Sequence, residues 1–146
     1  MCSSDLQMVR AAAPNMRRGG QGAVVNVASI AAVQGVGSSI AYAASKGALV
    51  TMTLSLARAL APKIRVNAIC PGFIDTRWFG EAFSAETVDR IRTNVKQSTP
   101  LQMASTAEDV AETALFLISR AARNITGETL LTDAGSHLNF TPLRPR

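Results

Sequence analysis

Short apolar strands and helical segments alternate along this chain, and that alternation limits the possible folds more than any other feature. Nearly continuous apolar runs rich in β-branched residues predict three strands, over 23–28, 64–69 and 128–132. Segments with helical character lie between them. Strands that alternate with helices form parallel sheets with right-handed crossovers. We therefore expect an α/β fold with a parallel sheet and flanking helices.

The helices are delimited by residue types that start and stop them. The end of one helix is predicted over 7–18, and a long helix over 40–61 is stopped by Pro62. Ser84 is predicted to cap a helix over 85–96, and a capping box formed by Thr106 and Asp109 opens a helix that runs to about residue 120. We predict loops over 29–39 and 73–81, and Pro71-Gly72 is predicted to end the second strand.

The helix over 40–61 carries one charge in its first four turns, Lys46, and is otherwise mostly Ala, Leu, Val and Met. A helix that is apolar nearly all round must be buried all round. Because a sheet covers only one side of a helix, the other side predicts a partner helix from a second subunit. We therefore expect a homo-oligomer formed through the helix over 40–61.

Tyr42 and Lys46 lie one turn apart on one face of this helix. An ammonium beside a phenol favours the phenolate, so such a tyrosine can exchange a proton with an alcohol or carbonyl near neutral pH. Ser29 follows the first strand, where its hydroxyl could hold the same substrate oxygen. Each residue alone has an ordinary structural explanation, but the three together favour catalysis.

These residues resemble the catalytic core of the short-chain dehydrogenases/reductases. The matching pattern, which runs from about residue 7 to 139, is Gly22-Ala-Val-Val-Asn-Val-Ala-Ser29, Tyr42-x-x-x-Lys46 and Arg65-Val-Asn-Ala-Ile-Cys-Pro-Gly72. The sheet would then be part of a doubly wound, Rossmann-like fold. The nearest likeness is to the 3-oxoacyl-carrier-protein reductases and the sugar or steroid dehydrogenases, which the sequence does not separate.

The resemblance implies hydride transfer between NAD or NADP and a carbonyl or secondary alcohol. Tyr42 would be the general acid or base, Lys46 would assist it and hold the nicotinamide ribose, and Ser29 would fix the substrate carbonyl. The loop that wraps the nicotinamide would contain Pro71, Gly72, Ile74 and Thr76. The sequence favours neither of two interpretations of Trp78, Phe79 and Phe83, which either line an apolar substrate pocket or belong to ordinary core or lid packing.

Other residues are interpreted as structural. Asn26 and Asn67 are predicted to tie strands together, Cys70 to be a buried thiol, and His137 to be a tail histidine without a catalytic role. The family usually reads Asp-Gly-Gly where this chain has Asp133-Ala134-Gly135, which puts in doubt any subunit contact that a bare backbone would make there.

No glycine-rich phosphate-binding loop of the family type occurs in the 146 residues. The resemblance therefore implies the C-terminal part of a longer domain over 7–139, with a non-family scar at 1–6 and a tail at 140–146. We expect this truncated chain to be inactive alone, and poorly soluble because strand 23–28 would become an open apolar edge. The alternative is a non-catalytic interaction fragment that docks on an intact homologue.

The remaining composition argues against other classes of function. The net charge of +5 is scattered and the single Trp and Tyr form no stacking platform, so we expect no nucleic-acid partner. The two cysteines and one histidine lack metal-ligand spacing, which predicts no metal site. No apolar run is expected to reach the length of a membrane span, so we expect no membrane partner and a reducing, cytoplasmic setting.

Overall fold

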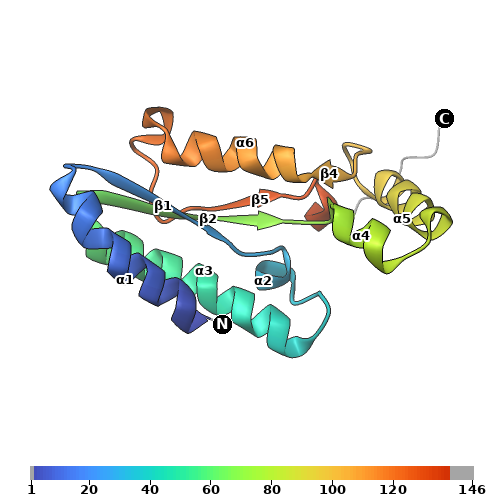
Figure 1. Ribbon diagram of the computed structural model, residues 1–146, viewed down its shortest axis with the longest axis horizontal. Coiled ribbons are helices and arrows are strands. Elements are labelled where there is room, and N and C mark those ends of the chain that lie inside the picture. The colour runs from blue at the N-terminus through green and yellow to red at the C-terminus, as the bar shows by residue number, and fades with distance from the viewer. Residues whose placement is uncertain (1, 139–146) are drawn as a thin grey trace.

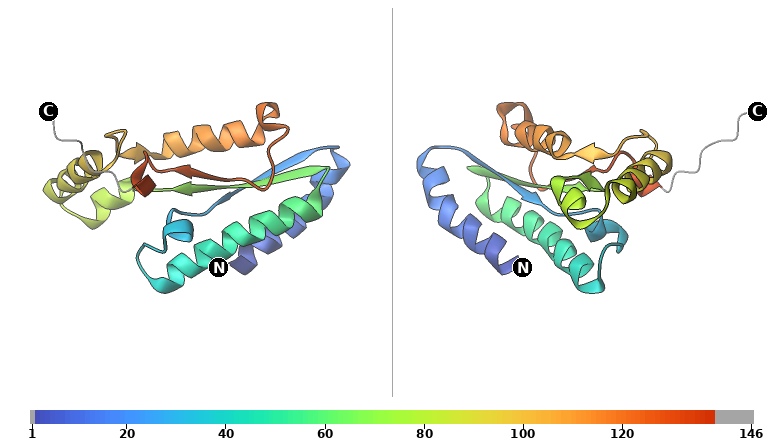
Figure 2. Two further views of the ribbon diagram at one scale, coloured as in Figure 1. Left: turned by 180° about the vertical axis from the view of Figure 1, so that it is seen from behind. Right: turned by 45° about the vertical axis from the view of Figure 1, so that its right-hand side comes forward.

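Three strands form one parallel sheet in the order β1-β2-β5, as the sequence predicted. The computed structural model describes residues 2–138. In it β1 spans Gly22–Val27, β2 spans Ile64–Pro71 and β5 spans Thr129–Thr132. Helices α1, α2 and α3 cover one face of the sheet and α6 covers the other, while α4 and α5 lie beyond its carboxyl end (Figure 1; Figure 2). The partial Rossmann-like α/β architecture is confirmed.

The long helices begin where the sequence places their caps. Helix α3 (Ile40–Leu60) is capped by the Ser39 hydroxyl, which accepts the Tyr42 N–H at 3.1 Å. Helix α6 (Ala107–Ile118) has both bonds of the predicted capping box, between Thr106 and Asp109. Helix α5 (Ala85–Ser98) has the predicted Ser84 cap. Helix α1 spans Cys2–Arg18 and contains the helix end predicted over 7–18.

The predicted loops contain short elements that the sequence did not indicate. Helix α2 (Ala31–Gln34) lies in the first loop and helix α4 (Arg77–Ala82) in the second. Strand β3 (Ile74–Asp75) pairs in parallel with β4 (Ser105–Thr106). Two short 3-10 helices follow, η1 (Arg120–Ala122) and η2 (Ser136–Leu138). Elements of two to six residues are too short to show a periodicity in the sequence. The pairing of β3 with β4 also joins segments that lie far apart in the chain.

Strand β2 does not end before Pro71, and this part of the prediction was wrong. A proline lacks a donor but keeps its acceptor. The Pro71 carbonyl accepts the Ile30 N–H at 3.0 Å, and Pro71 stands in register with Thr132. The proline is therefore tolerated as the last residue of the strand.

The core is built around β2, which is paired on both sides and covered on both faces. Its apolar side chains are almost fully buried, each at most 1% exposed: Ile64, Val66, Ala68, Ile69 and Cys70. Asn67 is also fully buried, and its amide donates to the Ile125 carbonyl at 3.1 Å and accepts the Glu128 N–H at 3.0 Å. Asn26 donates to Thr53 Oγ1 at 2.8 Å. Both asparagines are structural, as predicted, but Asn26 joins its strand to helix α3 (Ile40–Leu60) rather than to another strand.

Helix α3 packs against β2 and α2, and it buries Leu49, Thr53 and Ala57. Its other side stays open in the single chain, where Ile40 is 92% and Leu54 47% exposed. By length and hydropathy alone this helix could also span a membrane, contrary to the sequence expectation, but core helices of soluble proteins pass the same test. The partner helix predicted for the open side stays a prediction.

The outer edge of β1 is unpaired in the sheet. The N–H groups of Gly22 and Ala28 donate toward the β2 side, at 2.9 and 2.8 Å. Because peptide groups alternate along a parallel strand, those of Ala23, Val25 and Val27 point to the open edge. An apolar strand with such an edge is a template for pairing with other chains.

We predict that Val25→Pro removes edge-mediated association of the chain while leaving the sheet intact, since the lost N–H is one that faces the open edge. The matched control is Val24→Pro, which removes an N–H that faces β2, leaves its acceptor on β2 unpaired and should cost about 1–3 kcal/mol of folding free energy. Sedimentation velocity over a range of concentrations, with circular dichroism, tests both variants. Large concentration-dependent species that persist unchanged in Val25→Pro would contradict the assignment of the edge.

Candidate active site

The carboxyl ends of the three strands bring several of the predicted site residues to one edge of the sheet. Ser29 follows β1, Pro71 ends β2 with Gly72 directly after it, and Asp133 follows β5. Hydrogen bonds join these ends, from Ile30 N–H to the Pro71 carbonyl at 3.0 Å and from Gly72 N–H to the Thr132 carbonyl at 3.2 Å. In open α/β sheets this edge is where ligands bind.

Ser29 and Tyr42 are placed around the short helix α2. The Ser29 hydroxyl accepts the Ala31 N–H at 3.1 Å and so starts α2. Gly37, at φ 128°, leaves space for the Tyr42 ring, because a Cβ there would lie 3.1 Å from Tyr42 Cδ1 and 3.2 Å from the Ala31 Cβ. Ser29 thus bonds to Ala31, Gly37 lies between Ala31 and the Tyr42 ring, and both Ser29 and Tyr42 are half-buried. Sequence reasoning missed α2 and Gly37, although the glycine itself marks a position that favours positive φ.

Lys46 connects the tyrosine to the first strand. Its Nζ donates to the Val27 carbonyl at 3.0 Å and lies 5.8 Å from the centroid of the Tyr42 ring, within the range of a cation–π contact. The accepting carbonyl is one of those that face the open edge of β1. Lys46 thus holds a positive charge between the phenol and the strand that leads to Ser29.

Cys70 lies beneath this group and is fully buried, as predicted. Burial raises the pKa of the Cys70 thiol. A hydrogen bond from the backbone of Ser29 and the positive charge of Lys46 act in the opposite direction and lower that pKa. The pKa of Cys70 therefore depends on both Ser29 and Lys46.

The predicted cofactor loop is divided between two places. Gly72 approaches β5 so closely that a Cβ there would lie 2.7 Å from the Asp133 Cβ. Ile74 pairs with Ser105 in the small sheet, and Thr76 precedes α4 without making a side-chain capping bond. Within residues 2–138, no hydrogen bond or ring contact links Ile74 or Thr76 to Tyr42 or Lys46.

An ion pair that sequence reasoning missed anchors this loop to α5. The Asp75 carboxylate accepts from Arg92 Nε at 2.6 Å and from Arg92 Nη2 at 3.1 Å. Arg92 also donates to Asp89 at 3.1 Å. No spacing rule pairs residues that far apart in the chain, so the sequence offered no signal for the contact.

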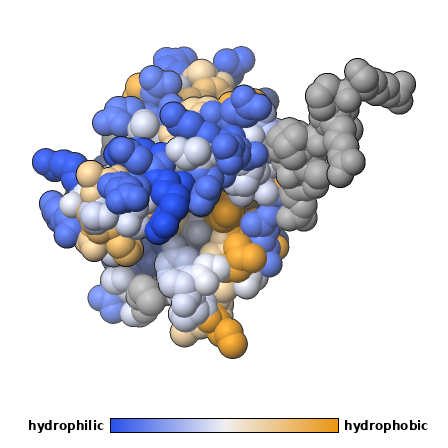
Figure 3. All heavy atoms as spheres, turned by 90° about the vertical axis from the view of Figure 1, so that its right-hand side faces the viewer, coloured by the Kyte–Doolittle hydropathy of each residue, from blue (hydrophilic) through white to orange (hydrophobic). Residues whose placement is uncertain are grey.

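The aromatic residues of this segment pack on one another. The ring centroids of Trp78 and Phe79 are 5.0 Å apart, those of Phe73 and Phe79 5.0 Å, and those of Trp78 and Phe83 6.0 Å. Trp78 remains 59% exposed. Figure 3 looks onto this end of the molecule and shows a largely hydrophilic face with several separate hydrophobic areas. A packed cluster is observed, and the substrate pocket stays a prediction.

The residues after β5 differ from the sequence interpretation in one respect. His137, which the sequence placed in the tail without a catalytic role, has a partner that the sequence did not indicate, because its Nδ1 lies 3.0 Å from both carboxylate oxygens of the buried Asp133. Asp133 also accepts the Gly135 and His137 N–H groups. Ala134 adopts φ 54°, a conformation that favours glycine. The side chain is thus tolerated where the family usually has glycine.

Comparison with known proteins identifies relatives along almost the whole chain. The family model described as enoyl-(acyl carrier protein) reductase matches residues 1–137. The chain is 38% identical over 122 residues to the 3-oxoacyl-[acyl-carrier-protein] reductase FabG of Chlamydia pneumoniae, covering 83% of this chain and 47% of the relative. It is 40% identical over 129 residues to the short-chain dehydrogenase/reductase homolog YusR of Bacillus subtilis, covering 88% of this chain and 94% of that one.

Solved structures show the same likeness. The NADP-bound structure of ElxO superposes with a TM-score of 0.78 at 30% identity, covering 89% of this chain and 52% of ElxO. Apart from YusR, the chain spans about half the length of the curated relatives that it matches first.

We predict that the Cys70 thiol reacts slowly with iodoacetamide at mildly alkaline pH, because a raised pKa leaves little thiolate, which is the reactive form. Lys46→Met should slow the reaction further, since the ammonium that lowers this pKa is removed. Peptide mass spectrometry across a pH series measures the rate at Cys70, and the exposed Lys96→Met is the matched control. A Lys46→Met rate equal to that of the control would place the ammonium away from Cys70.

Proposed function

Because the chain belongs to the short-chain dehydrogenase/reductase family of oxidoreductases, we propose that Ser29, Tyr42 and Lys46 carry its chemistry. The reaction is hydride transfer between NAD or NADP and a carbonyl or secondary alcohol. The observation that supports it best is the position of Lys46, with its ammonium beside the Tyr42 ring and bonded to the Val27 carbonyl.

In this proposal Tyr42 gives its phenolic proton to the substrate oxygen in reduction and takes it back in oxidation. The ammonium of Lys46 stabilises the phenolate that remains, because an opposite charge nearby favours the ionised form. The Ser29 hydroxyl is fixed at the start of α2, where it accepts the Ala31 N–H and keeps its own proton free to donate to the substrate oxygen. The protein thus positions the substrate and moves the proton.

The residues at the carboxyl edge suit a nicotinamide cofactor. Gly72 lets the backbone pass close to Asp133 where β2 ends, and the Thr76 hydroxyl makes no capping bond to α4. With Pro71 and Ile74 they would hold the nicotinamide end, while Tyr42 and Lys46 would hold the ribose. When bound, the nicotinamide ring supplies or accepts the hydride. NADP is present in the solved relative ElxO, and the choice between NAD and NADP is left open for this chain.

The chain alone is proposed to be inactive. Its 146 residues contain no family-type glycine-rich loop for the cofactor phosphates, and it spans about half of FabG. The relative's name makes a 3-oxoacyl group one candidate substrate, within the wider class of carbonyl compounds. A reducing, cytoplasmic setting is part of the proposal, and the free thiol of Cys70 is compatible with it.

The open side of α3 supports a homo-oligomer, since Ile40 and Leu54 are exposed on an otherwise apolar helix. The same face, with the unpaired edge of β1, favours a second candidate function. In that case the chain is a non-catalytic fragment that docks on an intact homologue. Co-purification with a full-length reductase, without nicotinamide turnover by the chain itself, would distinguish this second function from the first.

We predict that Tyr42→Phe lowers turnover by about two to four orders of magnitude, the range for loss of a general acid, in the longest natural polypeptide that contains this chain. Ser29→Ala should lower turnover markedly, whereas the exposed loop variant Ser38→Ala should not. The change in nicotinamide absorbance with a 3-oxoacyl thioester or a simple ketone measures all three. Turnover unchanged by Tyr42→Phe would reject the assigned role.

A further inference from the structure

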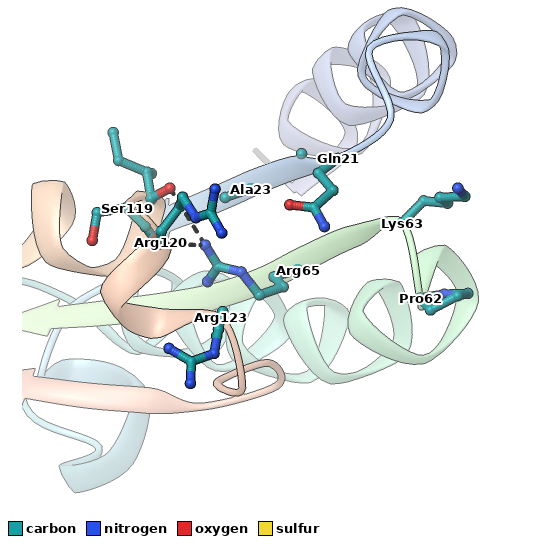
Figure 4. Close-up of a pocket in the computed structure, with 10 residues that line it drawn as sticks. Gln21, Ala23, Pro62, Lys63, Arg65, Ser119, Arg120 and Arg123 are labelled. Carbon is teal, nitrogen blue, oxygen red and sulfur yellow. Dashed lines mark hydrogen bonds between the residues drawn. The ribbon is translucent and has the colours of Figure 1, made fainter.

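A concave site lies around the amino ends of the strands, at the opposite end of the sheet from the candidate active site. It has a volume of about 310 Å³ and is lined by the starts of β1 and β2 and by the segment that follows α6. Figure 4 shows that its side chains come from these three segments. Ser29, Tyr42 and Lys46 do not line it. The proposed oxidoreductase chemistry therefore makes no use of this cavity.

The lining of the cavity is basic and contains no carboxylate. It includes four cationic residues, Lys63, Arg65, Arg120 and Arg123. Within residues 2–138, none of the four forms an ion pair. Charges of one sign in a hollow reinforce one another and attract counter-ions.

Arg65 contributes a charge that cannot move away. Its half-buried guanidinium donates to four backbone carbonyls, those of Leu117 at 2.7 Å, Ile118 at 3.4 Å, Ser119 at 3.0 Å and Ile125 at 3.3 Å. Four neutral carbonyls fix the group but do not cancel its charge. Arg65 also satisfies the terminal carbonyls of α6, so Arg120 and Arg123 are not needed to cap that helix.

The donors differ in mobility. Figure 4 shows the guanidinium groups of Arg65 and Arg120 on the side of the cavity that the Gln21 amide also faces, while the Lys63 ammonium extends away. Arg120, Arg123 and Gln21 are exposed, so they can turn toward a ligand without first breaking an ion pair. Guanidinium forks match the oxygens of phosphate in pairs, which favours this anion over a single point charge.

We infer that this cavity binds a small anion that carries two adjacent phosphate groups, held by Arg120 and Arg123 on either side of the fixed charge of Arg65. The volume is at the lower end of the range for small-molecule sites, which suits a diphosphate group better than a large organic ligand. Because the mobile donors are exposed, binding weakens as salt is added.

Isothermal titration of the full chain with inorganic pyrophosphate, at low salt and at about 150 mM salt, tests the site. The test variant is Arg120→Gln/Arg123→Gln. The matched control, Arg90→Gln/Lys96→Gln, removes the same charge from exposed positions on α5, at the other end of the molecule. Circular dichroism checks the fold of each, and the rise in melting temperature with pyrophosphate gives a second readout.

We expect saturable binding with one pyrophosphate per chain, weakened about tenfold or more in the test variant and unchanged in the control, since two charge-assisted contacts are lost only in the first. Equal weakening in both variants would show general charge attraction and overturn the site. Citrate that binds as tightly as pyrophosphate would overturn the phosphate class, and no binding at either salt concentration would overturn the inference as a whole.

Discussion

The whole arrangement depends on β2, because it is the strand that pairs on both sides and is buried on both faces. Parallel pairing fixes the direction of all three strands, so their carboxyl ends meet at one edge. Asn67 strengthens this alignment from inside the core, since its buried amide holds both Ile125 and Glu128 ahead of β5. A slip of the register would bury the wrong side chains and separate Ser29 from Pro71.

The elements with strong local signals could be predicted from the sequence. The β-branched runs predicted the sheet, and Ser84 and the Thr106–Asp109 box marked two helix starts. The Tyr42–Lys46 spacing predicted a shared helix face, which the contact between the Lys46 ammonium and the Tyr42 ring confirms. These features depend on periodicity or on neighbours a few residues away.

The remaining features depend on contacts that are distant in the sequence. The Asp75–Arg92 pair, the pairing of β3 with β4 and the hold of Arg65 on the end of α6 all join segments that no local rule connects. The same applies to Val27, whose carbonyl accepts the Lys46 ammonium because it faces the unpaired edge of β1. Sequence reasoning selected the residues that we propose as catalytic, but not the backbone group that positions one of them.

The carboxyl ends and the amino ends of the three strands differ in the side chains that surround them. At the carboxyl edge, half-buried polar side chains are fixed by helix α2 and by β1, as a reacting group requires. At the amino edge, exposed arginines surround a fixed guanidinium, which suits a soluble anion. Neither proposal depends on the other, because the two edges share none of the residues that carry the arguments.

The most direct test of the central account is an amide chemical-shift titration of the chain with nicotinamide mononucleotide, the half of the cofactor that the carboxyl edge should hold. The account predicts that the perturbed amides are those of Ser29, Tyr42, Lys46 and residues 74–76. Perturbations confined to other parts of the chain, or none up to saturating nucleotide, would contradict it.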